Sequence, residues 1–406
     1  MKIRSITYFC NPKFPLDEKI LRNAGEFLSQ AKSIYESAGY EVQTTRLATT
    51  PFPNILNGNV KELPALAQTL SGILPQIGVA YAALGPALIE FPESYAVIPE
   101  AISASENIFF GGVMADRKNG ISMRAILACA DVIQKTSTIE ANGFANLRFA
   151  ALANVKAGAP FFPAAYHDAD QSAFAIAVES ADLAVDAFAG QPTLDEGRSV
   201  LVAEIQKHGQ AIARIAHQEL SNTRFLGIDF SLAPSPNHAH SLGNAVEKMG
   251  VPKIGLHGSL AAAAILTEAI ERADFPRTGF SGFMQPVLED SVLARRAAEG
   301  TLTIKDALLY SAVCGTGLDT VPLPGDVTAA EMSPLLLDLC ALAMRLDKQL
   351  TARLMPVPGK GAGDATDFDF GFFANSKVMK LDSAPLHIPF SADQIISLNA
   401  RRHESA

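Results

Sequence analysis

The chain has 406 residues, of which 48% are hydrophobic and 18% charged, and its net charge is −9. This composition excludes a disordered chain, and the length allows two or three domains or one large α/β barrel. No Lys/Arg cluster longer than a pair is found, so a nucleic-acid surface is not indicated, and the acidic balance disfavours binding to anionic membranes.

Strand-like and helix-like segments alternate in chain order. Strands are predicted at residues 3–9, 41–47, 79–84, 107–111 and 224–232. Helices are predicted at residues 18–38, 121–135, 171–187, 194–221, 241–249, 259–272, 291–299, 303–313 and 333–350. This alternation predicts an α/β fold with a mostly parallel sheet covered by helices.

Several predicted helices begin with residues that suit a helix start. Ser241 and Ser259 stand at N-cap positions, and Pro334 stands at a favoured first helical position. Thr328 and Glu331 have the spacing of a capping box.

Targeting signals are not evident. Residues 1–8 are too short and too polar for a signal peptide, and no apolar run reaches the roughly 20 residues of a spanning helix. The cysteines Cys10, Cys129, Cys314 and Cys340 lie far apart without a Cys-x-x-Cys pair. We therefore expect a reducing compartment, the cytoplasm, and no structural zinc site.

Four loops predicted to follow strands carry the chemically interesting side chains, at residues 233–240, 255–259, 280–290 and 314–326. In α/β folds, ligands bind at the carboxyl ends of strands. The last of these loops, Cys314-Gly-Thr-Gly-Leu-Asp-Thr-Val-Pro-Leu-Pro-Gly-Asp326, combines a thiol with the carboxylates of Asp319 and Asp326. We expect it to lie at the centre of the functional site.

Asp229 lies inside an apolar strand pattern, two residues before Ser231. A buried carboxylate needs a cation or hydrogen-bond donors beside it. Asp229 is therefore either catalytic or metal-binding, or else bonded to backbone amides that fix the next loop.

The loop after Asp229 offers weaker candidates. His238 and His240 could ligate one metal ion if the loop curls, but no third ligand is near in the sequence. Ala239-His-Ser-Leu-Gly243 resembles a nucleophile elbow, yet a polar loop precedes it where a strand is required. A helix cap at Ser241 is the preferred interpretation over a serine hydrolase.

Two further loops have both a structural and a functional interpretation. His257 and Ser259 precede an Ala-rich helix, which predicts either an anion site or a tight turn with a cap. Glu289 and Asp290 precede the helix at 291–299, where they could favour the helix dipole or bind a hard cation with other oxygen ligands.

Two basic residues could contact an anionic substrate. Arg148, two residues after Asn146, is a candidate clamp for a carboxylate or phosphate. Lys360 lies in the Gly-rich segment Pro358-Gly-Lys-Gly-Ala-Gly-Asp364, which is either a lid over an anion or a plain turn.

The sequence does not identify a cofactor. No P-loop spacing and no dinucleotide Gly-x-Gly-x-x-Gly after a strand is found, so nothing signals a nicotinamide, flavin or P-loop nucleotide. A divalent cation could bind at Asp290 and Asp326.

Seven motifs in order resemble the bacterial and archaeal family called domain of unknown function 711. They are Asn146-Leu-Arg-Phe149, Pro160-Phe-Phe-Pro-Ala-Ala-Tyr-His167, Asp229-Phe-Ser-Leu-Ala-Pro-Ser-Pro236, His257-Gly-Ser-Leu-Ala-Ala-Ala263, Gly279-Phe-Ser-Gly282 with Pro286-Val-Leu-Glu-Asp290, the segment from Cys314 to Asp326, and the segment from Pro358 to Asp364. The resemblance covers almost the whole chain.

This family is similar in fold to pyruvate formate-lyase and anaerobic ribonucleotide reductase. The resemblance implies one domain over residues 1–406, which forms a ten-stranded α/β barrel with a loop threaded through its centre. Residues 190–195 could form a domain boundary, but a surface loop is the preferred interpretation there. Cys314 matches the active-site cysteine of the radical enzymes by motif order. The chain lacks their C-terminal glycyl radical motif, since Asp369-Phe-Gly371-Phe-Phe has no matching flanks.

The local electrostatics disfavour a thiolate at Cys314. It closes the predicted helix at 303–313, and both the negative end of that helix and Asp319 oppose a second negative charge. The carboxylates of Asp229, Glu289 and Asp319 are therefore better suited to polar chemistry, and Cys314 either reacts or only packs.

We therefore predict an enzyme that acts on a small anionic metabolite by non-radical lyase or hydrolase chemistry. Catalysis is assigned to Cys314, Asp319, Asp229 and Glu289, and substrate binding to Arg148, Asn146, Ser231, His257, Ser259 and Lys360. The alternatives are a non-catalytic protein that binds a small molecule or metal, and a serine hydrolase through Ser241. The expected partners are a small-molecule ligand and further copies of the chain in a homo-oligomer.

Overall fold

The computed structural model describes residues 1–401 as a mixed α/β fold built on one 11-stranded sheet. The strands are β1 (Lys2–Cys10), β2 (Val42–Pro51), β3 (Tyr81–Ala87), β4 (Ile108–Asp116), β5 (Gly120–Ser122), β6 (Phe149–Ala153), β7 (Ala173–Glu179), β8 (Arg224–Asp229), β9 (Gly317–Pro324), β10 (Leu350–Val357) and β11 (Ile395–Ile396). The longer helices are α1 (Glu18–Ser37), α3 (Leu63–Ile73), α5 (Met123–Thr136), α6 (Ala181–Phe188), α7 (Leu194–Glu219), α9 (Ser259–Arg272), α10 (Ser291–Glu299) and α12 (Ala329–Leu346). The shorter helices are α2 (Phe52–Ile55), α4 (Ile98–Ser103), α8 (Leu242–Lys248) and α11 (Ile304–Tyr310).

The main path of the sheet has the order β8-β7-β1-β2-β3-β4-β6-β10-β9. Strands β1, β2, β3, β4 and β6 run parallel to one another. At one end, β7 joins β1 antiparallel, and at the other end β10 joins β6 antiparallel. The predicted α/β class and mostly parallel pairing are therefore confirmed, with two antiparallel joins that the sequence did not indicate.

The pairing of strands does not close the sheet, because β8 and β9 are unpaired edges of its main path. Strand pairing alone therefore does not show the predicted ten-stranded barrel. The segment 276–287 nevertheless bonds to both edge strands. The amide of Ile228 on β8 donates to the carbonyl of Pro276 at 2.9 Å, and the amide of Val287 donates to the carbonyl of Asp319 on β9 at 3.0 Å. This segment thus spans the space between the two edges.

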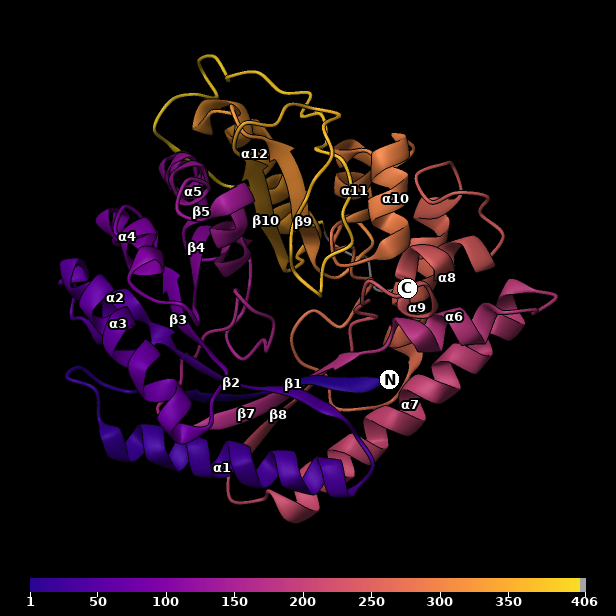
Figure 1. The fold of residues 1–406 in the computed structure, drawn as a ribbon, viewed down its shortest axis with the longest axis horizontal. Coiled ribbons are helices and arrows are strands. Elements are labelled where there is room, and N and C mark those ends of the chain that lie inside the picture. The colour runs from indigo at the N-terminus through magenta and orange to yellow at the C-terminus, as the bar shows by residue number, and fades with distance from the viewer. Residues whose placement is uncertain (402–406) are drawn as a thin grey trace.

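The helices lie on the outer side of the curved sheet, and loops occupy its inner side (Figure 1). Alternation along each strand explains this division, because successive side chains point to opposite faces. Large apolar residues such as Leu47, Phe174 and Leu354 belong to the main core under the helices. Small residues such as Ala83 and Ala175 face inward and leave room for the inserted Phe162.

Two predicted elements are wrong. Residues 171–187 were expected to be one helix, but β7 forms first and α6 follows. Alanine has the highest helix propensity, but propensity is a weak determinant of structure, and pairing of β7 between β1 and β8 overrides it. The predicted loop at 314–326 is largely the buried strand β9. Its two prolines are tolerated because β9 is the last strand of the path, and edge strands accept residues without an amide hydrogen.

The helix starts are partly as predicted. Ser241 caps α8 by accepting from the amide of Asn244, and Thr328 and Glu331 form the capping box of α12. Gly258, and not Ser259, is the N-cap of α9. Pro334 lies inside α12 because that helix begins at Ala329. Over residues 1–401, no helix is long and apolar enough to cross a membrane.

Candidate functional site

A cavity of about 530 Å³ lies on the inner face of the sheet. It is bounded by the first residues of β3 and β4 and by the last residues of β7 and β8, represented by Tyr81, Phe109, Glu179 and Asp229. These ends meet because β7 and β8 run opposite to β1. The expectation that ligands bind at the carboxyl ends of strands therefore holds here for β7 and β8. It does not hold for β3 and β4, which contribute their first residues.

A chain of alternating charges crosses the wall of the cavity. Arg4 on β1 donates to Glu289, Glu289 accepts from Arg353 Nη2 at 2.7 Å, and Arg353 Nε donates to Asp319 at 2.6 Å. All but Asp319 line the cavity. Glu289 thus bridges two arginines. Asp319, on β9, lies behind Arg353, which is on β10.

The two carboxylates in this chain differ in their proton affinity. Burial alone would raise the pKa of Glu289, but the charges of Arg353 and Arg4 outweigh it and hold that pKa below its usual value. Burial raises the pKa of Asp319, and Arg353 compensates only in part. One oxygen of Asp319, Oδ2, is buried without a hydrogen-bond partner in the described chain. The surroundings therefore stabilise the charged form of Glu289 more than that of Asp319.

Arg46 on β2 lies in the same cavity without a carboxylate partner among residues 1–401. Its Nε donates to Thr44 Oγ1 at 2.9 Å, and its guanidinium lies 5.1 Å from the centre of the Phe162 ring. Burial, with the charge of Arg4 next in weight, lowers the pKa of Arg46 to about 9. Arg4 Nη1 also has no described partner. Two guanidinium groups thus face the cavity with donors to spare, which is a site for an anion.

Glu179, the last residue of β7, is a buried carboxylate on the cavity wall. Its Oε2 accepts from Gln43 Nε2 at 3.0 Å, and its Oε1 lies 3.9 Å from Nδ1 of His240. An amide and a distant imidazole leave this carboxylate less tightly engaged than Glu289.

Asp229 and Ser231 line the cavity, as predicted for site residues. Asp229 accepts from the amides of Phe280 and Ser281 at 3.0 and 2.9 Å, and from Ser231 Oγ at 2.6 Å. Burial raises the pKa of Asp229 despite these bonds. Asp229 is thus bonded to backbone amides, as one of its two interpretations has it, but these amides belong to residues 280–281 and not to the loop that follows β8.

Arg148 also lines the cavity, but its donors are used. It donates to Glu140 at 2.7 Å and to the carbonyls of Ile102 and Ser105. Asn146 is fully buried and donates to the carbonyl of Ile133 at 3.1 Å, outside the cavity. The expected clamp therefore lies at the site but is engaged in the fold.

Cys314 does not line the cavity. Its thiol is fully buried, 3.8 Å from Gln285 Nε2, and its carbonyl accepts from Lys348. The structure therefore does not bring Cys314 into the cavity with the carboxylates of Asp229 and Glu289. The cause is the strand β9, which begins three residues later and directs Asp319, and not the thiol, toward Arg353.

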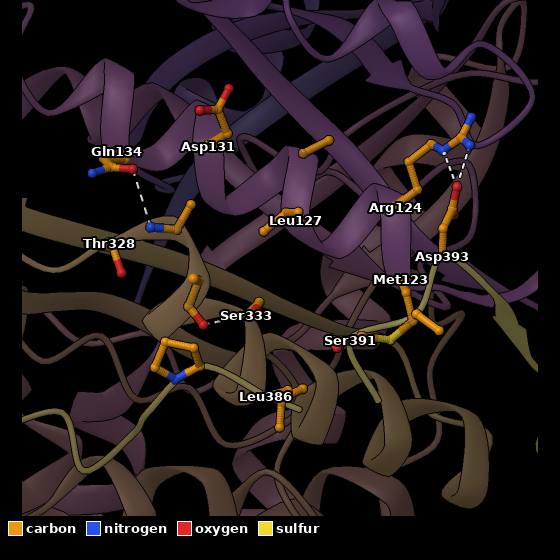
Figure 2. A pocket seen from close by; sticks show the side chains of 15 residues that line it. Met123, Arg124, Leu127, Asp131, Gln134, Thr328, Ser333, Leu386, Ser391 and Asp393 are labelled. Carbon is orange, nitrogen blue, oxygen red and sulfur yellow. Dashed lines mark hydrogen bonds and ion pairs between the residues drawn. The ribbon is translucent and has the colours of Figure 1, made fainter. Parts of the chain in front are cut away.

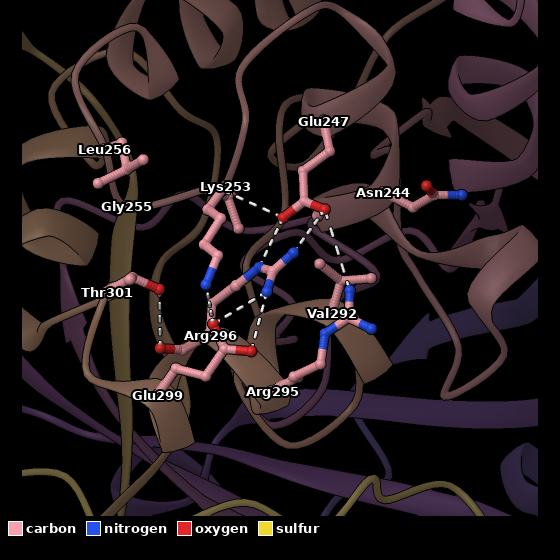
Figure 3. Close-up of polar contacts among 12 residues, drawn as sticks. Asn244, Glu247, Lys253, Gly255, Leu256, Val292, Arg295, Arg296, Glu299 and Thr301 are labelled. Atoms are coloured by element: carbon pink, nitrogen blue, oxygen red, sulfur yellow. Dashed lines mark hydrogen bonds and ion pairs between the residues drawn. The ribbon is translucent and has the colours of Figure 1, made fainter.

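The predicted anion loop at His257 and Ser259 is also remote from the cavity. His257 is exposed, and Ser259 Oγ accepts from the amide of Gly255 at 3.0 Å within its own turn. Ion pairs fix this region, as Figure 3 shows. Arg296 pairs with Glu247 and Glu299, and Lys253 pairs with Glu299.

Lys360 lies in a turn and not over the cavity, since it donates to the carbonyl of Ala365 and to Asp367. The Gly-rich segment thus takes its plainer form. It bonds to the turn after β9 through the amide of Gly325, which donates to the carbonyl of Lys360 at 2.9 Å.

The proposed cation ligands lie apart. Asp290 is fully buried and accepts from Ser241 Oγ and from the amides of Leu242, Gly243, Val292 and Leu293, so it joins the starts of α8 and α10. Asp326 is exposed in the turn after β9. Within the described part of the chain, no three His, Cys, Asp or Glu residues are grouped to hold a metal ion.

Ser241 is fully buried and donates to Asp290 Oδ1 at 2.6 Å. Its hydroxyl therefore joins the starts of α8 and α10. This confirms that Ser241 is a helix cap and not the nucleophile of an elbow.

Sequence reasoning missed Arg4, Arg46, Arg353 and Glu179. Each is a charged residue on a strand whose neighbours are buried, at residues 2–10, 42–51, 350–357 and 173–179. Burying a charge among apolar residues is costly unless it is paired, so this pattern is itself a signal of a polar inner face.

A second hollow of about 830 Å³ lies between α5, the start of α12 and the segment 385–393 (Figure 2). Its charged groups are paired: Arg124 bonds to Asp393, and Asp131 pairs with Lys135 at 2.7 Å. It offers no unpaired buried charge, so the smaller arginine-lined cavity is the candidate site.

A family model described as uncharacterised ACR (DUF711) matches residues 1–376. The UPF0210 protein of Pyrobaculum aerophilum is 31% identical, over 84% of this chain and 79% of that protein. The UPF0210 proteins of Thermoanaerobacter sp. and Methanocaldococcus jannaschii are 28% and 27% identical, over 95% and 94% of this chain and 88% of each relative.

Proposed function

This chain belongs to the DUF711 family of uncharacterised proteins, and from the geometry of its cavity we propose that it is an enzyme that acts on a small anionic metabolite. The observation that carries the proposal is Arg46. It faces the cavity beside Arg4 and lacks a carboxylate partner in the described chain. A carboxylate or phosphate between these guanidinium groups would supply the missing negative charge.

Glu179 is the group proposed to move a proton. It lines the same cavity, and its side chain is held by a neutral amide at 3.0 Å. Glu289 is bound by two arginines and Asp229 by two amides and a hydroxyl, so both are proposed to hold the site in shape. Acid–base chemistry at Glu179 agrees with a lyase or hydrolase.

We also propose that the sheet encloses the site as a barrel similar to that of pyruvate formate-lyase. The bonds of segment 276–287 to both edge strands support this enclosure. In this proposal Cys314 packs behind the site, because its thiol is buried outside the cavity, and the chemistry is non-radical.

The test is ligand-induced stabilisation, since a ligand that binds only the folded state raises the melting temperature. We would screen small carboxylates, phosphate esters and divalent cations against the wild type, R46M and R22M. Arg22 is an exposed residue of α1 away from the cavity, so R22M is the matched control. The expected result is a shift with anions in the wild type and R22M that is lost in R46M. Equal shifts in all three proteins would refute the anion site.

Turnover is tested with the anion found in this way. E179Q is expected to bind it with little change and to lose at least about 100-fold in rate, as removal of a general base does. A wild type that binds the anion without transforming it would favour a non-catalytic binding protein. That alternative is supported by the structural engagement of Asp229 and Glu289.

A further inference from the structure

Aromatic rings form the other half of the cavity wall. Tyr81, Phe109 and Phe162 stack in sequence, with ring centres 5.5 Å apart in both pairs and edge-to-face angles of 80° and 61°. These residues come from β3, from β4 and from the loop that enters the inner side of the sheet. Phe370 and Phe372, from the chain after β10, line the cavity as well, with ring centres 5.5 Å apart.

Several of these rings are incompletely covered. Tyr81 is 37% exposed and Phe372 is 56% exposed, although both line a cavity. Large apolar side chains contribute most to stability when they are buried. Rings left accessible in a cavity therefore favour a ligand that covers them, and a strongly hydrated ion such as free phosphate would not do so.

Arg46 connects this aromatic wall to the anion site. Its guanidinium lies 5.1 Å from the centre of the Phe162 ring, and the same ring packs against Phe109. Tyr81, at the other end of the row, is the register partner of Arg46 on the neighbouring strand β3, so the aromatic row lies beside the cation at both ends. A ligand that bonds to Arg46 through an acidic group would lay its remainder along Phe109 and Tyr81.

We infer that the cavity takes an aromatic carboxylate, a compound with an acid group bound by Arg46 and Arg4 and a flat ring packed against Tyr81 and Phe109. This inference rests on the proposed function and narrows its substrate class. The cavity volume of about 530 Å³ lies within the roughly 300–1,000 Å³ of small-molecule sites, so it accommodates a ring as well as an acid group.

The test measures dissociation constants by calorimetry for phenylacetate, cyclohexylacetate and inorganic phosphate. The first two share an acid group and similar size, and differ in the flat ring. The expected order of affinity in the wild type is phenylacetate, then cyclohexylacetate, then phosphate. In Y81L, the preference for phenylacetate over cyclohexylacetate should fall about 2- to 10-fold, because an aromatic pair contributes roughly 0.5–1.5 kcal/mol beyond burial.

F390L is the matched control, because Phe390 is also a half-exposed ring but lies outside the cavity, so its affinities should equal those of the wild type. Equal affinity for the two organic acids, or tighter binding of phosphate, would overturn the aromatic class while leaving the Arg46 anion site in place. Binding of none of the probes, or binding that R46M does not weaken, would overturn both.

Discussion

Arg46 is partly buried and Arg296 is buried, and the two regions treat the same side chain in opposite ways. Arg296, on α10, donates Nε and Nη2 to Glu247 at 2.8 and 2.9 Å and Nη1 to both oxygens of Glu299 at 2.9 Å (Figure 3). Those hydrogen bonds to Glu247 outweigh burial and raise the pKa of Arg296. Arg46 has one hydroxyl acceptor, and burial lowers its pKa to about 9.

The difference separates a structural ion network from a site. A folded protein gains nothing by burying an unpaired cation, so the cost of Arg46 must be offset by the fold around it or by a ligand. Arg296 has carboxylates on two sides and needs nothing further. Unequal pairing of similar residues is therefore more informative than the number of charges in either region.

The largest effect is expected from removing the carboxylate that pairs the cavity arginines. E289Q removes the negative charge that pairs with Arg4 and Arg353. Because breaking a buried ion pair costs about 3–5 kcal/mol, the free energy of unfolding should fall by that amount. E299Q, in the exposed part of the Arg296 network, should cost clearly less than E289Q, because solvent screens exposed ion pairs. Urea denaturation of both variants gives this comparison, and similar losses would show that the two networks do not differ.

Much of the fold could be predicted from the sequence, because helices such as α1 and α7 have both a periodic apolar face and identifiable ends. Asp17 caps α1, and Thr193 caps α7. β7 and β9 could not be predicted in this way. β7 is Ala-rich, and β9 contains two prolines and a glycine, so only their pairing partners, distant in the sequence, make them strands.

The site was predictable in part. Asp229, Ser231, Glu289 and Arg148 were predicted from loops and strand ends, and the structure places them at one cavity. Arg4, Arg46 and Arg353 were missed because each is a charged residue inside a strand and not in a loop. Pairing of β1 with β2 brings Arg4 close to Arg46, and Glu289 joins Arg4 to Arg353. The segment from Cys314 to Asp326 was predicted to be a loop that brings Cys314 and the carboxylates together, whereas the strand β9 directs only Asp319 toward Arg353.

A smaller effect is expected in the network on α10. R296M leaves Glu247 and Glu299 without their main donor, and lost hydrogen bonds to charged groups cost about 1.5–3 kcal/mol. R295M is the control, since Arg295 is half-exposed and lies 3.9 Å from Glu247, and it should change stability by less than about 0.5 kcal/mol. If R296M unfolds at the same urea concentration as R295M, the network does not stabilise the fold.

The smallest change, and the one with opposite sign, is expected for R46M without ligand. Removing an unpaired cation should leave the free energy of unfolding unchanged or raise it by roughly 0.5–2 kcal/mol. The pH dependence gives a second measure. The folded pKa of Arg46, about 9, is below its unfolded value, so above about pH 9 the unfolded state binds more protons than the folded state. The cost of Arg46 is therefore complete at neutral pH and declines as the pH rises through 9.

Urea denaturation of the wild type and R46M at several pH values between about 7 and 10 tests that sign. The advantage of R46M should shrink with rising pH, because wild-type stability gains relative to the variant as Arg46 loses its proton. A saturating anionic ligand should reverse the order at neutral pH, since it stabilises only the protein that retains its guanidinium. If R46M is instead less stable than the wild type by as much as R296M is, then Arg46 is paired in the folded protein and its contrast with Arg296 is wrong.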